Sequence, residues 1–554
     1  MHPLLILAIA VSIVLITILR FRLHAFLALT LAALVVALLT PRGAVERYEI
    51  ERAGVDFSVM PDSTGTAYLH IGTKHGATVG MRYLVMRQDA GLGEMATIAE
   101  VEIACITDDK PFRSYVGFID TRRPKLDVSD VIIHPLDLKV ARGKSQRTIG
   151  ERVAWAFGNT CGKIGILIAL AAIIGKCLLD SGAADRIVRS AIWLVGERRA
   201  PAAFLGSGFM LGIPVFFDTV FYLMMPLGKA MRMRTGRNYL LYVLTIVAGA
   251  SMAHSLVPPT PGPLFVSEAL GVDFGLMIVM GCLVGLCSST AAYLYAIAVN
   301  RRSELPLRES DDLSLQELEE LAQRHQGDLP PLALSVLPIV LPVILIAGNT
   351  ILKQLDSLAN IPILPVLAST LGNKNIAMAI AAAIAIVVLV WQKRTSRREL
   401  SDSVQSALAS GGVIILITAA GGAFGAMLQQ TGVASLIRGL PQYSPLVVLA
   451  LAFLITTGIR TAQGSATVAM ITAVGILSGF ANAELGCHPV YLALAIGCGS
   501  KPIAWMNDSG FWVICKMSGM TEAEGLRFVT PMSVLMGIVG LAATMLAATV
   551  MPMN

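Results

Sequence analysis

The chain of 554 residues carries little charge: only 14% of its residues are Asp, Glu, Lys or Arg, while 55% are apolar. An ordinary soluble domain has about 25% charged and about 45 to 50% apolar residues, so this composition cannot cover a globule with polar surface. Long apolar runs approach or reach the roughly 17 to 25 residues that span a bilayer: Leu4–Leu19, Ala25–Leu39, Ile164–Leu179, Leu276–Val299 and Ala379–Trp391. We therefore predict an all-α polytopic membrane protein.

The sequence also lacks the short motifs of several protein classes. It has no His-Glu-x-x-His and no Gly-x-Ser-x-Gly, and its nearest approach to a phosphate-binding loop, Gly158–Ile164, is one residue too short. The eight cysteines form no C-x-x-C pair. The net charge of +6 is spread over loops without interleaved aromatic residues, which argues against a nucleic-acid partner. We expect neither an enzyme nor a metal or cofactor site.

The distribution of basic residues predicts the orientation of the chain. Leu4–Leu19 has no basic residue before it and no small-residue cleavage site after it, so we expect a retained helix and not a signal peptide. Arg20 and Arg22 follow it and mark a cytoplasmic loop by the positive-inside rule. The N-terminus and the region after residue 40 are then external, and residues 1–40 form two transmembrane helices.

Residues 41–148 differ from the rest of the chain because they are charged and have no long apolar run. Short segments rich in β-formers, separated by turn residues, predict strands at Thr66–Ile71, Met81–Met86, Ala96–Ile106, Arg113–Ile119 and Asp130–His134. We predict a small inserted all-β domain, a barrel or sandwich, on the external side. The basic run from Lys139 to Arg152 argues for the opposite side, but long domains translocate largely regardless of charge.

The remainder of the chain shows an internal repeat. A shift of 250 residues aligns residues 151–189 with residues 401–439 without a gap, matching for example Gly175 with Gly425. We expect one transport repeat at residues 149–300, a cytoplasmic linker at 301–331, connecting transmembrane helices at 332–400 and a second repeat at 401–554. The linker includes a short amphipathic helix at Leu313–Leu321.

Two interruptions of the apolar segments keep the same spacing. Gly212–Asp218 corresponds to Arg460–Val468, and Gly249–Gly262 corresponds to Gly499–Phe511. Backbone groups cannot stay bare in hydrocarbon, so broken helices occur where they line a protein-enclosed cavity. Interrupted segments at matching places in two halves are a sequence pointer to a transporter's binding site.

Several rare strings resemble one known family. The segment from His254 through Val257-Pro258-Pro259-Thr260-Pro261-Gly262-Pro263 is similar to the proline-rich signature of the gluconate permease (gluconate:proton symporter) family, and Gly464-Ser465-Ala466-Thr467-Val468-Ala469 resembles its second signature. Asn507–Trp512 and Phe216–Asp218 also agree with the family. The resemblance covers about residues 1–40 and 149–554, whereas family members have only a short connection in place of the insert.

The resemblance implies a multi-pass carrier of the bacterial cytoplasmic (inner) membrane. It would take up gluconate or a related sugar acid together with a proton, by alternating access between two inverted repeats with re-entrant hairpins. The residues that match the signatures are candidates for binding the anionic solute: Pro258, Pro259, Thr260, Gly464, Ser465, Ala466, Thr467 and Asn507. Charged residues at membrane depth are functional by default, so Asp218, His254 and Asp508 are candidates for proton coupling. Arg460 and Lys501 are candidates for the counter-ion of the substrate.

Each of these assignments has an alternative. His254 could instead donate to a carbonyl freed by the broken helix, Asp218 could pair with Lys501 or Arg460, and Lys176 and Asp180 could form a structural pair. The substrate could be glycerate, a hexuronate, a dicarboxylate or serine, and the protein could be a membrane sensor that uses its inserted domain. A homodimer and the partner of the insert stay open.

Overall fold

The computed structural model describes residues 2–21, 23–59, 67–71, 73–88, 95–107, 113–119, 124, 126, 127, 130–308, 329–354, 364–393, 397–432, 444–481 and 486–553. Contacts divide the chain into two units. The first unit contains Met1–Val11, Ala32–Trp155 and Ala426–Leu436, and the second contains Ser12–Leu31, Ala156–Gly425 and Ile437–Asn554. The helix predicted at Leu313–Leu321 lies outside the described residues.

The insert in the first unit is built on one antiparallel sheet. Its strands run in the order β1-β2-β5-β4-β3-β6, with the bounds β1 (Phe57–Val59), β2 (Ala67–Leu69), β3 (Arg82–Gln88), β4 (Met95–Thr107), β5 (Arg113–Phe118) and β6 (Val131–Ile133). A 3-10 turn, η1 (Thr73–His75), follows β2. Val55, just before β1, forms a single bridge with Ile132 of β6, so the sheet curls and its two edges approach each other.

The prediction of an all-β insert is wrong in one respect, although strands lie at all five predicted places. Two helices, α3 (Arg42–Ala53) and α4 (Pro135–Ser145), flank the sheet and pack against each other. Each buries only a narrow apolar stripe on a charged helix, Val45 and Ile50 on α3 and Leu138 and Ala141 on α4. Such a stripe is a weak periodic signal, which explains why the pattern did not reveal them.

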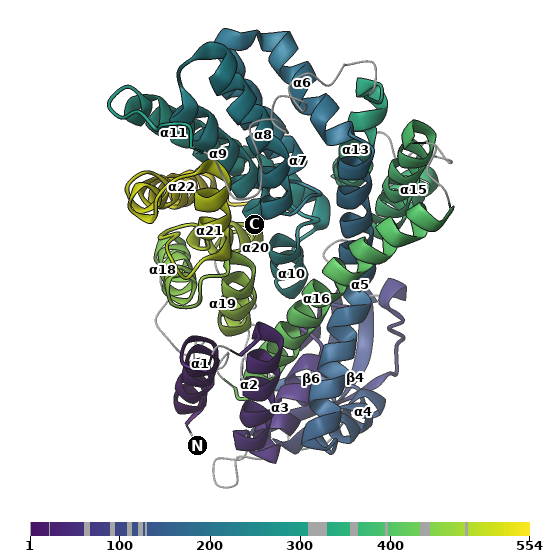
Figure 1. Ribbon diagram of the computed structural model, residues 1–554. Coiled ribbons are helices and arrows are strands. Elements are labelled where there is room, and N and C mark those ends of the chain that lie inside the picture. Colours follow the sequence, from purple (N-terminus) through teal and green to yellow (C-terminus); the bar gives the residue numbers. More distant parts are fainter. Residues whose placement is uncertain are drawn as a thin grey trace. The chain divides into compact units, whose positions relative to one another are not determined.

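The second unit and the segments that lead into it are helical (Figure 1). The two N-terminal helices are α1 (Pro3–Leu19) and α2 (Ala25–Leu39). The first half of the remaining chain contains α5 (Ile149–Asp180), α6 (Ala183–Val195), the 3-10 turn η2 (Glu197–Arg199), α7 (Ala200–Leu211), α8 (Phe217–Thr235), α9 (Tyr239–Leu256), α10 (Pro261–Ala269) and α11 (Phe274–Asn300). Three connecting helices follow, namely α13 (Leu332–Gln354), α14 (Leu364–Leu371) and α15 (Lys374–Lys393).

Six described helices of the second half follow one another at a spacing similar to that of six helices in the first. It contains α16 (Arg397–Gln429), α18 (Pro445–Gln463), α19 (Ala466–Ala481), α20 (Pro489–Gly499), α21 (Ser509–Ser518) and α22 (Glu522–Val550). Matched with α5, α7, α8, α9, α10 and α11, these helices start between 245 residues later, for Ala200 and Pro445, and 250 residues later, for Tyr239 and Pro489. The spacing seen in the sequence thus recurs in the helix boundaries.

Two pairs of helices, α5 with α16 and α11 with α22, run antiparallel where they contact each other. Asp180, at the end of α5, accepts a hydrogen bond from Ser403, near the start of α16, at 2.8 Å. At the other end of the same two helices, Arg152 donates to Gln430 at 2.6 Å, and the helices lie side by side in Figure 1. In the same sense, Tyr295 near the end of α11 donates to the carbonyl of Phe528 near the start of α22, at 3.1 Å.

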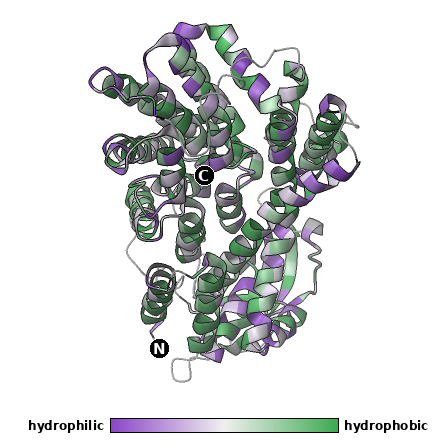
Figure 2. Cartoon of the chain, viewed as in Figure 1, coloured by the Kyte–Doolittle hydropathy of each residue, from purple (hydrophilic) through white to green (hydrophobic). Residues whose placement is uncertain are grey.

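Among the described residues, eight helices are long and apolar enough to cross a membrane, or nine if α2 and α3, which meet at 102°, count as one broken span. These eight are α5, α9 with α10, α11, α13, α15, α16, α18 and α22. Figure 2 shows hydrophobic residues along most of their length and hydrophilic residues gathered at helix ends and on the insert. This pattern is that of helices surrounded by lipid and by one another.

Close helix packing inside each half depends on two glycines spaced 250 residues apart. A Cβ on Gly249 of α9 would lie 2.2 Å from the carbonyl oxygen of Leu205 on α7, and one on Gly499 of α20 would lie 2.6 Å from that of Phe453 on α18. These distances are far shorter than any van der Waals contact. The small residues therefore let the helix backbones touch, as in other membrane bundles.

We expect Gly249→Ala to destabilise the protein by about 1 to 3 kcal/mol, because the added methyl group must push two backbones apart. Gly206→Ala on α7 is the matched control, since a Cβ there meets nothing within 4 Å. Thermal unfolding in detergent should show a lower midpoint for the first variant and an unchanged or higher one for the second. Equal midpoints would contradict the packing argument.

Candidate functional site

Two helices break at the centre of the second half. α18 ends at Gln463 and α19 begins at Ala466, with only Gly464 and Ser465 between them. Gly464 has a φ of +87°, a conformation that favours glycine. A Cβ on Gly464 would also lie 2.1 Å from the backbone oxygen of Asn507, so only glycine permits this approach.

The second break joins α20 to α21 and is fastened to the first. Asn507 donates from Nδ2 to the carbonyls of Thr461 at 2.7 Å and Ala462 at 3.1 Å, and the Trp505 indole donates to Thr461 at 3.0 Å. The last carbonyls of a helix have no partner within the helix. The side chains of one broken segment thus satisfy the backbone of the other.

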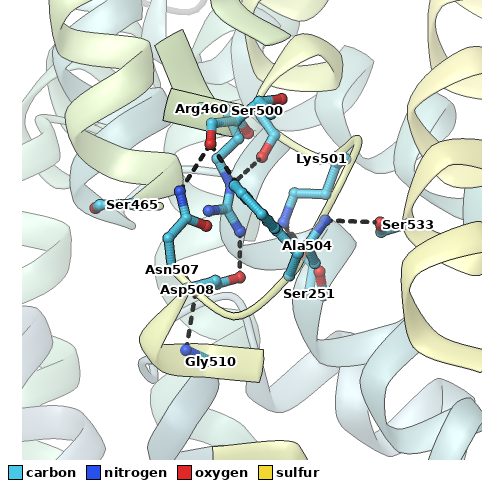
Figure 3. A network of polar contacts seen from close by, with 12 residues as sticks. Ser251, Arg460, Ser465, Ser500, Lys501, Ala504, Asn507, Asp508, Gly510 and Ser533 are labelled. Carbon is cyan, nitrogen blue, oxygen red and sulfur yellow. Dashed lines mark hydrogen bonds and ion pairs between the residues drawn. The ribbon is translucent and has the colours of Figure 1, made fainter. Parts of the chain in front are cut away.

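An ion pair lies between the two breaks (Figure 3). Arg460 of α18 is 5% exposed, pairs through Nη2 with Asp508, and donates from Nε to the carbonyl of Ser500 at 3.1 Å. Asp508 also caps α21 by accepting the N–H of Gly510 at 2.9 Å. The Nη1 atom of Arg460 is buried and has no partner among the described residues.

Lys501 is a second buried cation in this region. Its ammonium group donates to the backbone and side-chain oxygens of Ser251 on α9, each at 2.9 Å, and the side chain is shown in Figure 3. Ser251 and Lys501 are 250 residues apart, so the contact joins matched positions of the two halves. No carboxylate lies within ion-pair distance of Lys501 in the part of the chain that the structure describes.

Asp218 lies in the first turn of α8, close enough to Asp508 for the two carboxylates to interact electrostatically. Within the described ranges it forms neither an ion pair nor a hydrogen bond, so its pairing with Arg460 or Lys501, one of the alternatives above, is wrong. Arg460 forms its ion pair with Asp508 instead, and Lys501 donates to Ser251. By contrast, Lys176 and Asp180 form the expected pair on α5, at 2.8 Å.

His254 lies in the last turn of α9, one turn after Ser251. Its ring packs edge-on against Phe216, with 6.3 Å between ring centroids, and it interacts electrostatically with Lys501. Its Nδ1 atom is buried and has no partner among the described residues. Among the described residues, Nδ1 therefore does not donate to a carbonyl freed by the broken helix, which was the alternative role of His254.

The two signature segments meet, but their side chains face different surroundings. A Cβ on Gly262, at the start of α10, would lie 3.8 Å from the Cα atom of Thr467 in the second signature, and 2.0 Å from a side-chain atom of the nearby Met470. Thr260 is buried and donates to the carbonyl of Val257 at 2.6 Å, while Pro258 and Pro259 line an apolar pocket. Of three other predicted site residues, Ser465 immediately precedes α19, and Ala466 and Thr467 are its first two residues.

The structure adds residues that the sequence analysis did not single out. Ser251 and Ser500 hold the two cations through oxygen atoms, and Gln463 is buried beside Gly464. Gln463 could have been recognised, because an amide at membrane depth next to a helix break is as unusual as a charge. The two serines could not, since serine is common in helices that cross membranes.

Comparison with known proteins places this chain in a family. The model of the GntP family permeases matches residues 129–550. The chain belongs to the GntP permease family. The matched range begins at residue 129, so it does not include residues 1–40, for which the sequence also suggested a resemblance, nor most of the insert.

Two curated relatives and one solved structure illustrate the similarity. The inner membrane permease YgbN of Escherichia coli is 30% identical, covering 75% of this chain and 92% of the relative, and the gluconate permease of Pseudomonas aeruginosa is 31% identical, covering 71% and 86%. The Alcanivorax borkumensis YdaH transporter has a TM-score of 0.53 at 14% identity, covering 85% of this chain and 95% of that one, and shows the fold alone.

Family membership settles the class of the protein. The family consists of permeases, so this chain is a transporter and not an enzyme. The eight apolar helices of its described residues and its bacterial permease relatives identify a multi-pass protein of the inner membrane.

Proposed function

We propose that this permease is a secondary active carrier that takes up gluconate or a related sugar acid together with a proton, by alternating access. Its relative from P. aeruginosa is a gluconate permease. One observation supports the proton coupling: the site has balanced charges, and among the described residues only the pair of Arg460 and Asp508 is neutralised by direct contact. The remaining two, on Lys501 and Asp218, are available to a substrate anion and a proton.

The charge balance supports a stoichiometry. Arg460, Lys501, Asp218 and Asp508 sum to zero when all four are ionised. A bound monovalent anion would leave one uncompensated negative charge, which is costly inside a membrane. Protonation of Asp218 removes that charge, so one proton and one carboxylate enter the site together without changing its net charge.

The geometry supports particular roles for the residues. The N-terminus of α19 at Gly464–Thr467 offers backbone amides and a positive helix end to a carboxylate. The counter-ion is Lys501 or Nη1 of Arg460, which has no partner among the described residues. Asn507 and the hydroxyls of Ser465 and Thr467 complete the cradle. Thr260, Pro258 and Pro259 shape its wall, and His254 and Asp508 stay second candidates for the proton.

The arrangement of helices supports the rest of the proposal. Matched helices that run antiparallel favour two inverted repeats at residues 149–300 and 401–554, joined by the linker 301–331 and the helices of 332–400. The breaks before α10 and α21 correspond to the expected re-entrant hairpins. Such repeats expose a central site alternately to the two sides of the membrane.

The insert, residues 41–148, is proposed to be external. Basic residues follow α15 and precede α16, which marks that end of α16 as cytoplasmic. The end of α5 lies beside the start of α16, through Asp180 and Ser403. The start of α5, which the insert precedes, is then at the external end. The partner of the insert and a homodimeric state are open to experiment.

Uptake of labelled gluconate into proteoliposomes tests the proposal. We expect accumulation under an inward proton gradient, its loss with a protonophore, and competition by unlabelled gluconate that exceeds that by glycerate, hexuronates, dicarboxylates or serine. Stronger competition by another acid would replace the substrate but keep the carrier. No uptake of any acid would favour a membrane sensor built on the insert.

A further inference from the structure

The side-chain amide of Gln463, in the second unit, is buried and has no hydrogen-bond partner among the described residues. Gln463 is the last residue of α18 and only 8% exposed. Both of its amide atoms, Oε1 and Nε2, are buried without a hydrogen-bond partner among the described residues. Buried polar groups in native proteins are almost always hydrogen-bonded, so an amide with both ends unpaired suggests that a ligand supplies the partners.

Asn507 presents a second unpaired amide oxygen at the same break. Its Nδ2 donates to two carbonyls, of Thr461 and Ala462, which identifies the other atom as the oxygen. That Oδ1 atom is buried and has no partner in the described part of the chain. Gly464, which follows Gln463, would place a Cβ only 3.2 Å from the Asn507 amide carbon, so both amides belong to one small region.

The unpaired atoms define the chemistry of their ligand. Two acceptors, Oε1 of Gln463 and Oδ1 of Asn507, require donors, while Nε2 of Gln463 requires an acceptor. A carboxylate only accepts hydrogen bonds, so it cannot donate to the two amide oxygens. An alkyl chain can form a hydrogen bond with none of the three atoms. A hydroxyl group both donates and accepts, and neighbouring hydroxyls on one carbon chain match the set.

We propose that Gln463, together with Asn507, binds hydroxyl groups of the substrate and thereby selects polyhydroxylated acids over plain carboxylates. The inference rests on the proposed function, because it assigns part of the substrate to that site. It separates two tasks: charged groups hold the carboxylate, and the amide pair recognises the polyol chain. Sites built to hydrogen-bond a hydroxyl reject analogues that lack it more strongly than apolar pockets reject a change of size.

The decisive variant is Gln463→Met, which keeps the shape of the side chain and removes both polar atoms. Affinity is measured by ligand-induced thermal stabilisation of the full-length protein in detergent, with gluconate and with hexanoate, a carboxylate of similar length without hydroxyls. We expect the affinity for gluconate to fall about tenfold or more, as for the loss of one or two hydrogen bonds, and that for hexanoate to stay the same or rise.

The unliganded variant distinguishes recognition from structure. Replacing an unpaired buried amide with an apolar group removes a destabilising feature, so Gln463→Met without ligand should unfold at the same temperature as the parent protein or higher. Ser288→Ala is the control, since the Ser288 hydroxyl on α11 is also buried and has no partner among the described residues, but lies against α22. It should leave the ratio of the two affinities unchanged.

Two outcomes overturn the inference, and a third concerns the proposed function. If Gln463→Met retains the preference for gluconate, whether or not it also unfolds at a lower temperature, Gln463 is not a recognition residue. If the parent protein binds hexanoate as well as gluconate, the amide pair selects nothing. If the parent protein neither binds nor transports any sugar acid, the proposed function fails before the variant is considered.

Discussion

Replacing Asp218 with asparagine is expected to abolish proton-driven accumulation of substrate, while exchange of labelled for unlabelled substrate continues. Asp218 lies beside Asp508 and has neither an ion pair nor a hydrogen bond among the described residues, whereas Asp508 is held by Arg460 and Gly510. An asparagine mimics the protonated carboxyl group permanently. The variant can therefore bind the anion but cannot release a proton on the other side.

The size of the effect follows from the charge balance of the site. With one proton per anion, a pH gradient of one unit corresponds to about 1.4 kcal/mol and about tenfold accumulation. For Asp218→Asn the internal concentration should only equal the external one, which is measured in proteoliposomes with an imposed gradient. Exchange is measured in the same vesicles, preloaded with substrate.

Asp185→Asn is the matched control for the loss of a buried carboxylate. Asp185 is 7% exposed and pairs with Arg189 one turn later on α6, at 2.9 Å. We expect its variant to lose some stability and to keep tenfold accumulation. If Asp218→Asn still accumulated substrate above the external concentration, Asp218 would not be the proton-binding residue, and that role would belong to His254 or another group.

The sequence predicted the broken segments because their signals are local. Proline, glycine and polar residues interrupt apolar runs at Gly249–Gly262 and Arg460–Val468, and helices do end within these ranges. The same holds for five of the six described strands of the insert, which are runs of β-formers between turn residues, whereas the three-residue strand β1 was not predicted. Local composition is enough to predict an element when it differs sharply from its surroundings.

The partners within the site could not be predicted in this way. Arg460 and Lys501 were equal candidates for the counter-ion, but only the fold shows that Arg460 meets Asp508, while Lys501 reaches back 250 residues to Ser251. The hydroxyl of Thr260 was predicted in the cradle, yet it donates to the carbonyl of Val257 within its own turn. The periodicity of a sequence predicts which face of a helix is buried, but not which residue of another element contacts that face.

Breaking the ion pair between Arg460 and Asp508 is expected to have the largest effect on stability. The pair is buried, with side chains 5% and 14% exposed, and removing one partner of such a pair leaves an uncompensated charge, at a cost of about 3 to 5 kcal/mol. We expect this loss for Arg460→Met and for Asp508→Asn. The latter keeps an oxygen that can still cap α21 at Gly510.

The double variant, Arg460→Met with Asp508→Asn, removes both charges and should recover most of that loss, so its cost is far below the sum of the two single costs. Unfolding by denaturant in detergent measures the free energies of unfolding of the two single variants and the double variant. The control is the pair of Arg82 on β3 and Glu102 on β4, whose side chains are 64% and 39% exposed. Because this pair is exposed, we expect its coupling energy to be below about 1 kcal/mol. Additive costs at Arg460 and Asp508 would show that the pair does not stabilise the fold.

Transport by the double variant then separates the structural role of Arg460 from its role in binding. Nη1 of Arg460 is buried and unpartnered among the described residues, although Nε and Nη2 are both satisfied by protein oxygens. If that nitrogen contacts the substrate carboxylate, the double variant folds but does not take up gluconate. Restored uptake would mean that Arg460 serves only to fasten the two breaks, and that Lys501 alone neutralises the substrate.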